Sequence, residues 1–230
     1  MGINKRNHEM PDLNSEVFRP RDTCLSCFRV TRLCWCSRLK PFAIEPTVVL
    51  LVHPREFMKT IGTARIVKRS IENAILWRGN GSQIDGDPEL LKLLHDPTRF
   101  SVILFPGQDS VNLSEIKSEE LRLRIPPSKK LTVFILDGTW TTAKQLLRGS
   151  KILQTLPKVS FNVHTLSQYG FRKQPEDYCL STVEAVCELI ENLSTQGLCT
   201  RPEDDAHLQM LKCFQALVDS QTRFELVKAN

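Results

Sequence analysis

Four short segments of the chain are rich in β-branched and aromatic residues and are bounded by proline, glycine or polar residues. Segments of this kind are typical of strands that are buried in a parallel sheet. The sequence therefore predicts four strands, at residues 46–52, 100–105, 131–136 and 159–164.

Segments with apolar residues at helical spacing separate these strands. The first is capped at Thr60 or Thr63 and keeps its apolar spacing as far as Ile75. Ser181-Thr-Val-Glu184 has the sequence of a capping box and opens a helix that reaches Leu193. Further helices are predicted at residues 89–95, from 114, at 141–148 and at 203–218. The alternation of strands and helices predicts an α/β fold, in which a mainly parallel sheet is covered by helices on both faces.

The strand at residues 131–136 ends in Asp137-Gly-Thr-Trp140. Because open parallel sheets bind ligands at the carboxyl ends of their strands, Asp137 is a candidate functional acid. The helix predicted at 141–148 would point the backbone N–H groups of its first turn into the same crevice. An Asp-Gly turn beside a core tryptophan would give the same local pattern.

A second polar group follows the first predicted strand. His53-Pro-Arg-Glu56 places a histidine, an arginine and a glutamate at a strand end, as expected for substrate contacts, although a helix cap and turn have a similar composition. Arg65, Lys68 and Arg69 share the polar face of the next predicted helix. That face is either a solvated side of the helix or part of a track that binds RNA phosphates.

The composition, with 41% hydrophobic and 25% charged residues, is that of an ordinary globular protein, and 230 residues suffice for one α/β domain with a small appendage. No apolar run reaches the length of a membrane span, and the polar first residues lack the pattern of a signal peptide. We therefore expect a cytoplasmic protein without a membrane partner. Residues 1–20 are polar, aperiodic and contain two prolines, which predicts a mobile arm.

The positive charge is concentrated in the first third of the chain. Residues 1–80 hold 14 Lys and Arg against 7 Asp and Glu, a net charge of +7, and since the whole chain carries +5, residues 81–230 sum to −2. A basic segment suggests a polyanionic partner, while the modest total argues against a purely electrostatic nucleic-acid binder. A basic surface that serves only solubility is the alternative.

The eight cysteines fall into two groups. A Cys-x-x-Cys pair and a Cys-x-Cys pair make up the first: Cys24, Cys27, Cys34 and Cys36. Four thiolates at this spacing can surround one Zn²⁺ tetrahedrally, and so short a segment has no core of its own, so we predict a structural zinc knuckle. Disulfides are the alternative, which a cytosolic redox poise disfavours. The scattered cysteines are expected to be free thiols that pack as small hydrophobes: Cys179, Cys187, Cys199 and Cys213.

Basic and aromatic residues alternate around the clustered cysteines. These residues are Phe28, Arg29, Arg32, Trp35, Arg38 and Lys40. They are compatible with a surface that contacts RNA, since aromatic rings stack on bases and cations pair with phosphates. Alternatively, the aromatic residues pack the knuckle onto the main domain.

The motifs of the chain, taken in order, resemble one family. The cysteine cluster is followed by His53-Pro-Arg-Glu56, Phe105-Pro106, Asp137-Gly-Thr-Trp140, Tyr169-Gly-Phe-Arg-Lys-Gln-Pro175 and Leu180-Ser-Thr-Val-Glu-Ala185. Over about residues 24–193 this series is similar to the DTW-domain family, which is named for its Asp-x-Thr-Trp motif. The family is similar to SPOUT-type knotted methyltransferases, so the resemblance implies a SPOUT-like fold with a trefoil knot near the C-terminal strands. Ordinary connection rules would not predict a knot.

The resemblance implies a tRNA-uridine aminocarboxypropyltransferase. Such an enzyme moves the 3-amino-3-carboxypropyl group of S-adenosylmethionine to N3 of a tRNA uridine and releases methylthioadenosine. A SPOUT-like RNA methyltransferase and a non-catalytic, zinc-containing RNA-binding protein are the alternatives. The implied partner is tRNA, and nothing in the sequence indicates an obligate protein partner.

The resemblance also implies roles for single residues. Asp137 would be the general base or the anchor of the ammonium group of S-adenosylmethionine, and Arg172 would hold its carboxylate. The adenosine moiety of S-adenosylmethionine would be held by Pro106, Gly107, Ser181 and Thr182, and Thr139 and Trp140 would contact either S-adenosylmethionine or a base that has left its stack. The RNA contacts would come from His53, Arg55, Arg65, Arg69 and Lys173. The chain would then divide into a mobile arm (1–20), a zinc knuckle (21–40) and an α/β catalytic domain (41–230).

Overall fold

The computed structural model describes residues 22–57, 59, 62–163 and 180–229, with side chains through residue 220. In these ranges the strands form one six-stranded sheet with the order β2-β1-β5-β3-β6-β4, and every pair of neighbours is parallel. The strands are β1 (Thr47–Val52), β2 (Ile75–Arg78), β3 (Arg99–Leu104), β4 (Ser110–Asn112), β5 (Lys130–Asp137) and β6 (Lys158–Ser160).

The sheet confirms the predicted fold class. The first three predicted strands correspond to β1, β3 and β5, and β6 lies at the start of the fourth. β1 is buried at every position, and β5 lies between β1 and β3 in the middle of the sheet. The sequence pattern does not predict β2 and β4, because both are short and neither is fully buried along its length.

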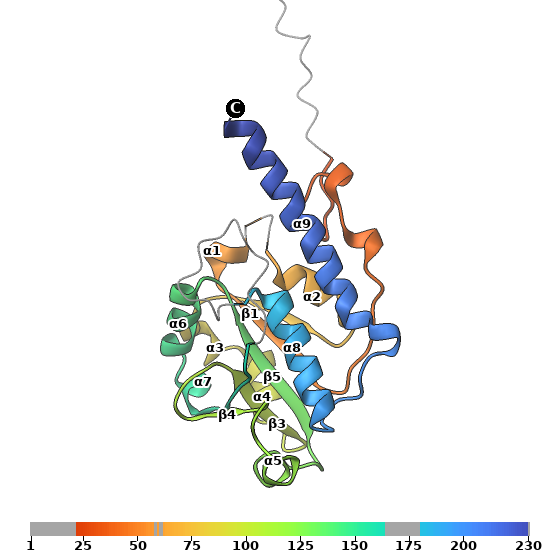
Figure 1. Ribbon diagram of the computed structural model, residues 1–230. Helices are drawn as coiled ribbons and strands as arrows, with labels where there is room; N and C mark the ends of the chain where they lie inside the picture. Colours follow the sequence, from red (N-terminus) through yellow and green to blue (C-terminus); the bar gives the residue numbers. More distant parts are fainter. Residues whose placement is uncertain (1–21, 58, 60–61, 164–179, 230) are drawn as a thin grey trace, which may run out of the picture.

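Helices cover both faces of the sheet (Figure 1). The described ranges contain α1 (Pro54–Phe57), α2 (Ala64–Ser70), α3 (Gly81–Ile84), α4 (Pro88–Leu94), α5 (Ser118–Arg124), α6 (Trp140–Gly149), α7 (Lys151–Thr155), α8 (Thr182–Thr195) and α9 (Ala206–Ala229). Val48 and Leu50 of β1 belong to a core that includes residues of α2, α8 and α9. The alternate residues Val49 and Leu51 belong to a second core on the other face of the sheet, which includes residues of α3, α4 and α7. This alternation is the reason why β1 is apolar throughout.

One predicted helix ends earlier than its apolar spacing suggests. α2 stops at Ser70, because the backbone of Ile71 becomes extended and forms a bridge with Phe42. Ile75, which the pattern assigned to the helix, starts β2 and pairs with β1. Similarly, the helix predicted from Ser114 begins only at Ser118. At Ile71 pairing with a distant residue overrides local periodicity, whereas the Ser114 hydroxyl donates to Asn192 Oδ1 of α8 and does not cap the helix.

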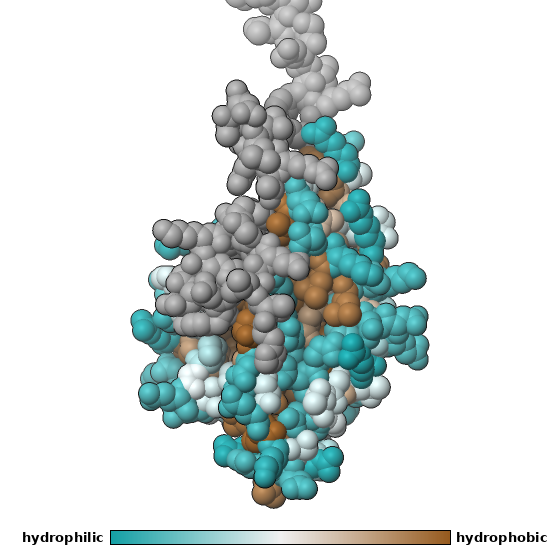
Figure 2. Space-filling model, in the orientation of Figure 1, coloured by the Kyte–Doolittle hydropathy of each residue, from teal (hydrophilic) through white to brown (hydrophobic). Residues whose placement is uncertain are grey.

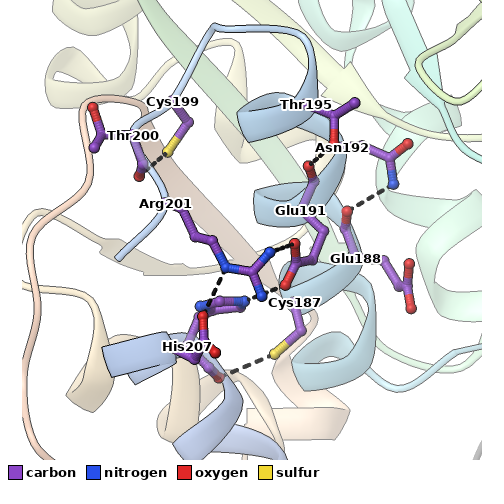
Figure 3. Close-up of polar contacts among 10 residues, drawn as sticks. Cys187, Glu188, Glu191, Asn192, Thr195, Cys199, Thr200, Arg201 and His207 are labelled. Atoms are coloured by element: carbon purple, nitrogen blue, oxygen red, sulfur yellow. Dashed lines mark hydrogen bonds and ion pairs between the residues drawn. The ribbon is translucent and has the colours of Figure 1, made fainter. Parts of the chain in front are cut away.

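A polar network fixes the start of α9 against α8 (Figure 3). Glu191 of α8 accepts a hydrogen bond from Arg201 Nη1 at 2.6 Å and contacts His207 Nε2 at 2.7 Å. Arg201 Nε also donates to Asp205 Oδ1 at 2.7 Å. Further along α9, Phe214 is fully buried in the first core. The last amphipathic helix predicted from the sequence is therefore confirmed, and it is part of the core.

The segment with the clustered cysteines packs on that same core. Cys27, Trp35 and Leu39 are buried in it. Arg29 is buried as well, and its Nη2 atom donates to Ser220 Oγ of α9 at 3.3 Å. Trp35 therefore attaches the knuckle to the main domain, which is one of the two roles that the sequence left open.

Two predictions depend on residues outside the described ranges. They are the mobile arm at 1–20 and the trefoil knot, which would involve the chain between β6 and α8 and hence residues 164–179. Both stay predictions. In the part of the chain that is described, none of the helices combines the length and apolar character of a membrane span. Hydrophilic residues cover much of the face in Figure 2, and hydrophobic residues gather toward its middle.

Candidate functional site

Asp137 lies at the carboxyl end of the central strand β5. Its side chain is 5% exposed, and in the register of the sheet it lies opposite Val52, the last residue of β1. Thr182, in the first turn of α8, donates its hydroxyl hydrogen to Asp137 Oδ1. The acid predicted from the end of the apolar run is thus held between a strand end and a helix N-terminus, where the helix dipole favours negative charge.

The residues after Asp137 form a tight turn into α6. Gly138 is required here, because a Cβ atom would lie 2.3 Å from Thr142 Oγ1. Thr139 is the N-cap of α6, and its Oγ1 atom accepts the backbone N–H of Thr142 at 3.2 Å. This cap aims the first turn of α6 at the same edge of the sheet as Asp137.

The side chain of Trp140, just after β5, contacts the residue that follows the end of β3. Its ring stacks on Phe105, with a centroid distance of 5.2 Å and an interplanar angle of 6°. Lys144 Nζ lies 5.3 Å from the centroid of the same ring. Trp140 is only partly buried, so the alternative of an Asp-Gly turn beside a core tryptophan does not describe this turn.

Asp137 lines a small pocket between the strand ends and the α1–α2 region. The residues around the pocket are Val52, Glu56, Phe57, Gly62, Ala64, Arg65, Leu76 and Asp137. Two acids and one cation, Glu56, Asp137 and Arg65, thus share a site in which each of them is buried. Buried charged residues around one pocket at the end of a parallel sheet mark a candidate functional site.

Arg65 does not lie on the solvated helix face that the sequence predicts. It is 7% exposed and donates to the carbonyl oxygens of Phe57 and Lys59, the latter at 2.8 Å. Its guanidinium carbon lies 4.9 Å from the centroid of the Phe57 ring. Burial lowers the pKa of Arg65, and the negative charge of Asp137 opposes this effect. The prediction of a shared exposed stripe is therefore wrong for Arg65, and Lys68 and Arg69 alone are exposed.

His53 is also buried, at the start of α1. It is 8% exposed, its backbone N–H donates to the carbonyl oxygen of Asp137 at 3.3 Å, and its Nδ1 atom accepts the backbone N–H of Arg55 at 3.2 Å. The ring thereby orders the turn that leads to Glu56, whose Oε1 atom lies 2.7 Å from Lys59 Nζ. The side chain of Arg55 is exposed.

The other predicted site residues fall into three groups. Pro106 and Gly107 are exposed at the end of β3, where the Ser110 hydroxyl donates to the carbonyl oxygen of Gly107 at 2.7 Å. Ser181 is the N-cap of α8 and forms the predicted capping box with Glu184. Arg172 and Lys173 lie outside the described residues.

Not every pocket residue was predicted from the sequence. Glu56 belongs to the motif that begins at His53 and was expected to contact substrate because of its place at a strand end. Phe57 gives no such signal, because an apolar residue at the end of a short helix is common. Its position beside Arg65 emerges only when α1 and α2 are brought together.

The four clustered cysteines converge on one point. Their Sγ atoms lie within 4.8 Å of one another, with 3.8 Å between Cys24 and Cys36 and 3.7 Å between Cys27 and Cys34. Zn–S bonds of about 2.3 Å in a tetrahedron place sulfur atoms about 3.8 Å apart. The donor set therefore fits a structural Zn²⁺, and four protein ligands leave no position for a catalytic water.

The protein environment shifts the pKa values of these thiols in opposite directions. The backbone N–H groups of Cys27 and Ser26 lower the pKa of Cys24 to about 6. Burial raises the pKa of Cys27 and of Cys36. Buried thiolates need a nearby positive charge, which a bound metal ion supplies.

The scattered cysteines behave as the sequence predicts where the structure describes them. Cys187, Cys199 and Cys213 are buried free thiols. Burial raises the pKa of Cys199 to about 12 and that of Cys213 to about 11. A raised pKa disfavours the thiolate form that a cysteine nucleophile needs at neutral pH. Cys179 lies outside the described residues.

The knuckle, Asp137, α8 and most of α9 all lie within a segment that matches one known protein family. The DTW domain matches residues 21–222, which is most of the chain. The chain belongs to the DTW-domain family. In this DTW domain the acid of the name-giving motif is Asp137, its threonine is the cap of α6, and its tryptophan is stacked on Phe105.

Three curated relatives of this DTW domain carry the same name. The tRNA-uridine aminocarboxypropyltransferase 2 of Drosophila melanogaster is 28% identical over 181 residues, which cover 76% of this chain and 68% of the relative. The protein of the same name from Macaca fascicularis is 28% identical over 220 residues, or 92% and 70% of the two chains. That from Mus musculus is 28% identical over 211 residues, or 88% and 66%. No solved structure matches the chain at a significant level.

Proposed function

We propose that the protein transfers the 3-amino-3-carboxypropyl group of S-adenosylmethionine to N3 of a uridine in tRNA. The named relatives and the shared DTW domain support this class of transfer. The observation that carries the proposal is the position of Asp137, which is a buried acid at the end of a central strand. It accepts a hydrogen bond from the first turn of α8, and it lines a pocket together with Arg65.

In the proposed reaction, the γ-carbon of the methionine moiety loses its bond to sulfur and gains a bond to nitrogen. Uridine N3 attacks the γ-carbon of the methionine moiety, a C–N bond forms, and the C–S bond breaks. The sulfonium sulfur takes the electron pair and leaves as methylthioadenosine, while the N3 proton is lost. Because a sulfonium is already a good leaving group, the protein mainly has to align N3 with the C–S bond and accept the proton.

Asp137 suits either of two tasks in this reaction. As a general base it accepts the N3 proton, and as an anchor it pairs with the ammonium group of S-adenosylmethionine. The Thr182 hydroxyl fixes the orientation of the carboxylate for either task. Uridine must leave its base stack to reach an acid that is 5% exposed, which is the usual requirement for chemistry on a base.

The remaining assignments follow from the motif series. Arg172 holds the carboxylate of S-adenosylmethionine, because a planar guanidinium can donate two parallel hydrogen bonds to a carboxylate. The adenosine moiety is held near the Trp140 and Phe105 stack, by Pro106, Gly107, Thr139, Ser181 and Thr182. Phosphates of tRNA pair with Arg55, Arg69 and Lys173, and the Cys₄ zinc maintains the knuckle.

A transfer assay with two labels tests this function. Unmodified tRNA is incubated with S-adenosylmethionine that carries label in its carboxyl carbon and, in parallel, in its methyl group. Label from the carboxyl carbon alone should enter the RNA. Incorporation of methyl label instead would replace the proposal with an RNA methyltransferase. Incorporation of neither label, with folded, zinc-loaded protein and several tRNA pools, would favour a non-catalytic RNA-binding protein.

A further inference from the structure

Phe28 is an exposed aromatic residue on the zinc knuckle. Its side chain is 43% exposed, whereas Trp35 in the same segment is 5% exposed and belongs to the core. Phenylalanine is usually buried in folded proteins. Packing of the knuckle onto the main domain therefore accounts for Trp35 and leaves the exposure of Phe28 unexplained.

The backbone of Phe28 is also unusual. Its φ angle is 57°, in the left-handed region, where glycine is favoured and a bulky side chain is strained. The residue directly follows Cys27, so the turn of the knuckle would form more easily with glycine at this position. An exposed aromatic ring on a strained backbone position is a reason to look for a function of that ring.

The ring of Phe28 contacts the wall of the Asp137 pocket. Its centroid lies 6.3 Å from that of Phe57 in an edge-to-face arrangement, and 4.5 Å from the guanidinium carbon of Arg65. Phe57 and Arg65 both line the pocket that contains Asp137. The knuckle thus brings an aromatic ring to the border of the pocket, and the buried cation of Arg65 holds the ring in place.

We propose that Phe28 is a stacking platform for an unstacked nucleobase of the substrate RNA. This inference rests on the proposed function and specifies how the RNA is held beside the pocket. A uridine that reacts at N3 has left its stack, and exposed aromatic rings are the usual supports for bases that are splayed out. The contact with Arg65 orients the ring, and its exposed part remains for the base.

Substitutions at Phe28 separate stacking from structure. Phe28→Gly removes the ring and the backbone strain together, and Phe28→Leu keeps apolar bulk without an aromatic face. Both variants should bind unmodified tRNA with affinity reduced roughly ten- to one-hundred-fold, with a similar loss in kcat/KM for tRNA. Phe28→Trp and Phe28→Tyr should retain binding, because they keep an aromatic face. The KM for S-adenosylmethionine should not change in any of the four.

Leu25 offers a matched control, because it lies in the same knuckle and is 86% exposed. Leu25→Ala should leave tRNA binding and turnover unchanged. Zinc content and melting temperature are measured for every variant, and Phe28→Leu carries the test if Phe28→Gly does not fold. Wild-type tRNA affinity in Phe28→Leu, or an equal loss in Phe28→Trp and Phe28→Leu, would overturn the inference.

The two proposals fail in different ways. If the wild-type protein transfers carboxyl label and Phe28→Leu does so with unchanged tRNA affinity, the inference about Phe28 is wrong and the proposed function stands. If the wild-type protein transfers no label, the proposed function is wrong. In that case an affinity for tRNA that depends on the aromatic ring would still support the stacking platform.

Discussion

Gly138 occupies a position where any side chain would collide with the first turn of α6. A Cβ atom there would lie 2.3 Å from Thr142 Oγ1 and 3.2 Å from Thr142 Cβ. Gly138→Ala should therefore lower the free energy of unfolding by about 1–3 kcal/mol, as measured by urea denaturation. Gly107→Ala is the control, because a Cβ atom at Gly107 would meet no atom within 4 Å. Equal losses in the two variants would contradict this account of the turn.

At the scale of residues, some site positions could be predicted and others could not. Asp137 was predictable because the end of a buried parallel strand fixes where its last residue lies. The burial of Arg65 was not predictable, because helical spacing alone places a charged residue on the solvent-exposed face. Its burial depends on the Phe28 and Phe57 rings and on two backbone carbonyl oxygens, which come from other segments.

At the scale of elements, α8 has a direct connection to the site, because Thr182 donates to Asp137. Thr182→Val keeps the size of the side chain and removes this hydrogen bond to a charged group. The rate of transfer should fall roughly ten-fold or more, since such bonds contribute about 1.5–3 kcal/mol. The rate is measured under single-turnover conditions with saturating S-adenosylmethionine.

Thr195 at the other end of α8 provides the control for this prediction. Its hydroxyl donates to the carbonyl oxygen of Glu191 at 2.9 Å on the exposed side of the helix. Thr195→Val should transfer at the wild-type rate. A rate for Thr182→Val within two-fold of this control would rule out a contribution of the bond to turnover.

The elements that could be predicted are those with a strong local signal. The capping box at Ser181 places the start of α8 correctly, and the apolar runs place β1, β3 and β5. β2 and β4 have no such signal, because none of their residues is buried and their strand geometry comes from pairing with β1 and β6. The early end of α2 has the same cause.

At the scale of the whole molecule, the knuckle and the last helix stabilise each other. Cys27 and Trp35 lie in one core with Phe214 of α9. Removal of zinc by a chelator should lower the melting temperature and shift tryptophan fluorescence to the red as Trp35 becomes exposed. Readdition of Zn²⁺ should restore both signals. An unchanged melting temperature in zinc-free protein would contradict a structural metal centre.

The packing of the knuckle on α9 was the least predictable feature. The spacing of the cysteines indicates a knuckle, but the sequence does not show that its interior joins the core around α9. That contact connects residues almost two hundred positions apart, such as Arg29 and Ser220, and no local pattern encodes it.

The most direct test of the central claim concerns Asp137. Asp137→Asn preserves the shape of the side chain and removes its charge. With saturating S-adenosylmethionine and tRNA, the single-turnover rate of aminocarboxypropyl transfer should fall by roughly 10²-fold or more, while the affinity for tRNA stays within two-fold of wild type. A loss that disappears as S-adenosylmethionine is raised would identify Asp137 as the ammonium anchor rather than the base. A wild-type rate at every concentration of S-adenosylmethionine would contradict the assignment of the reaction to this end of the sheet.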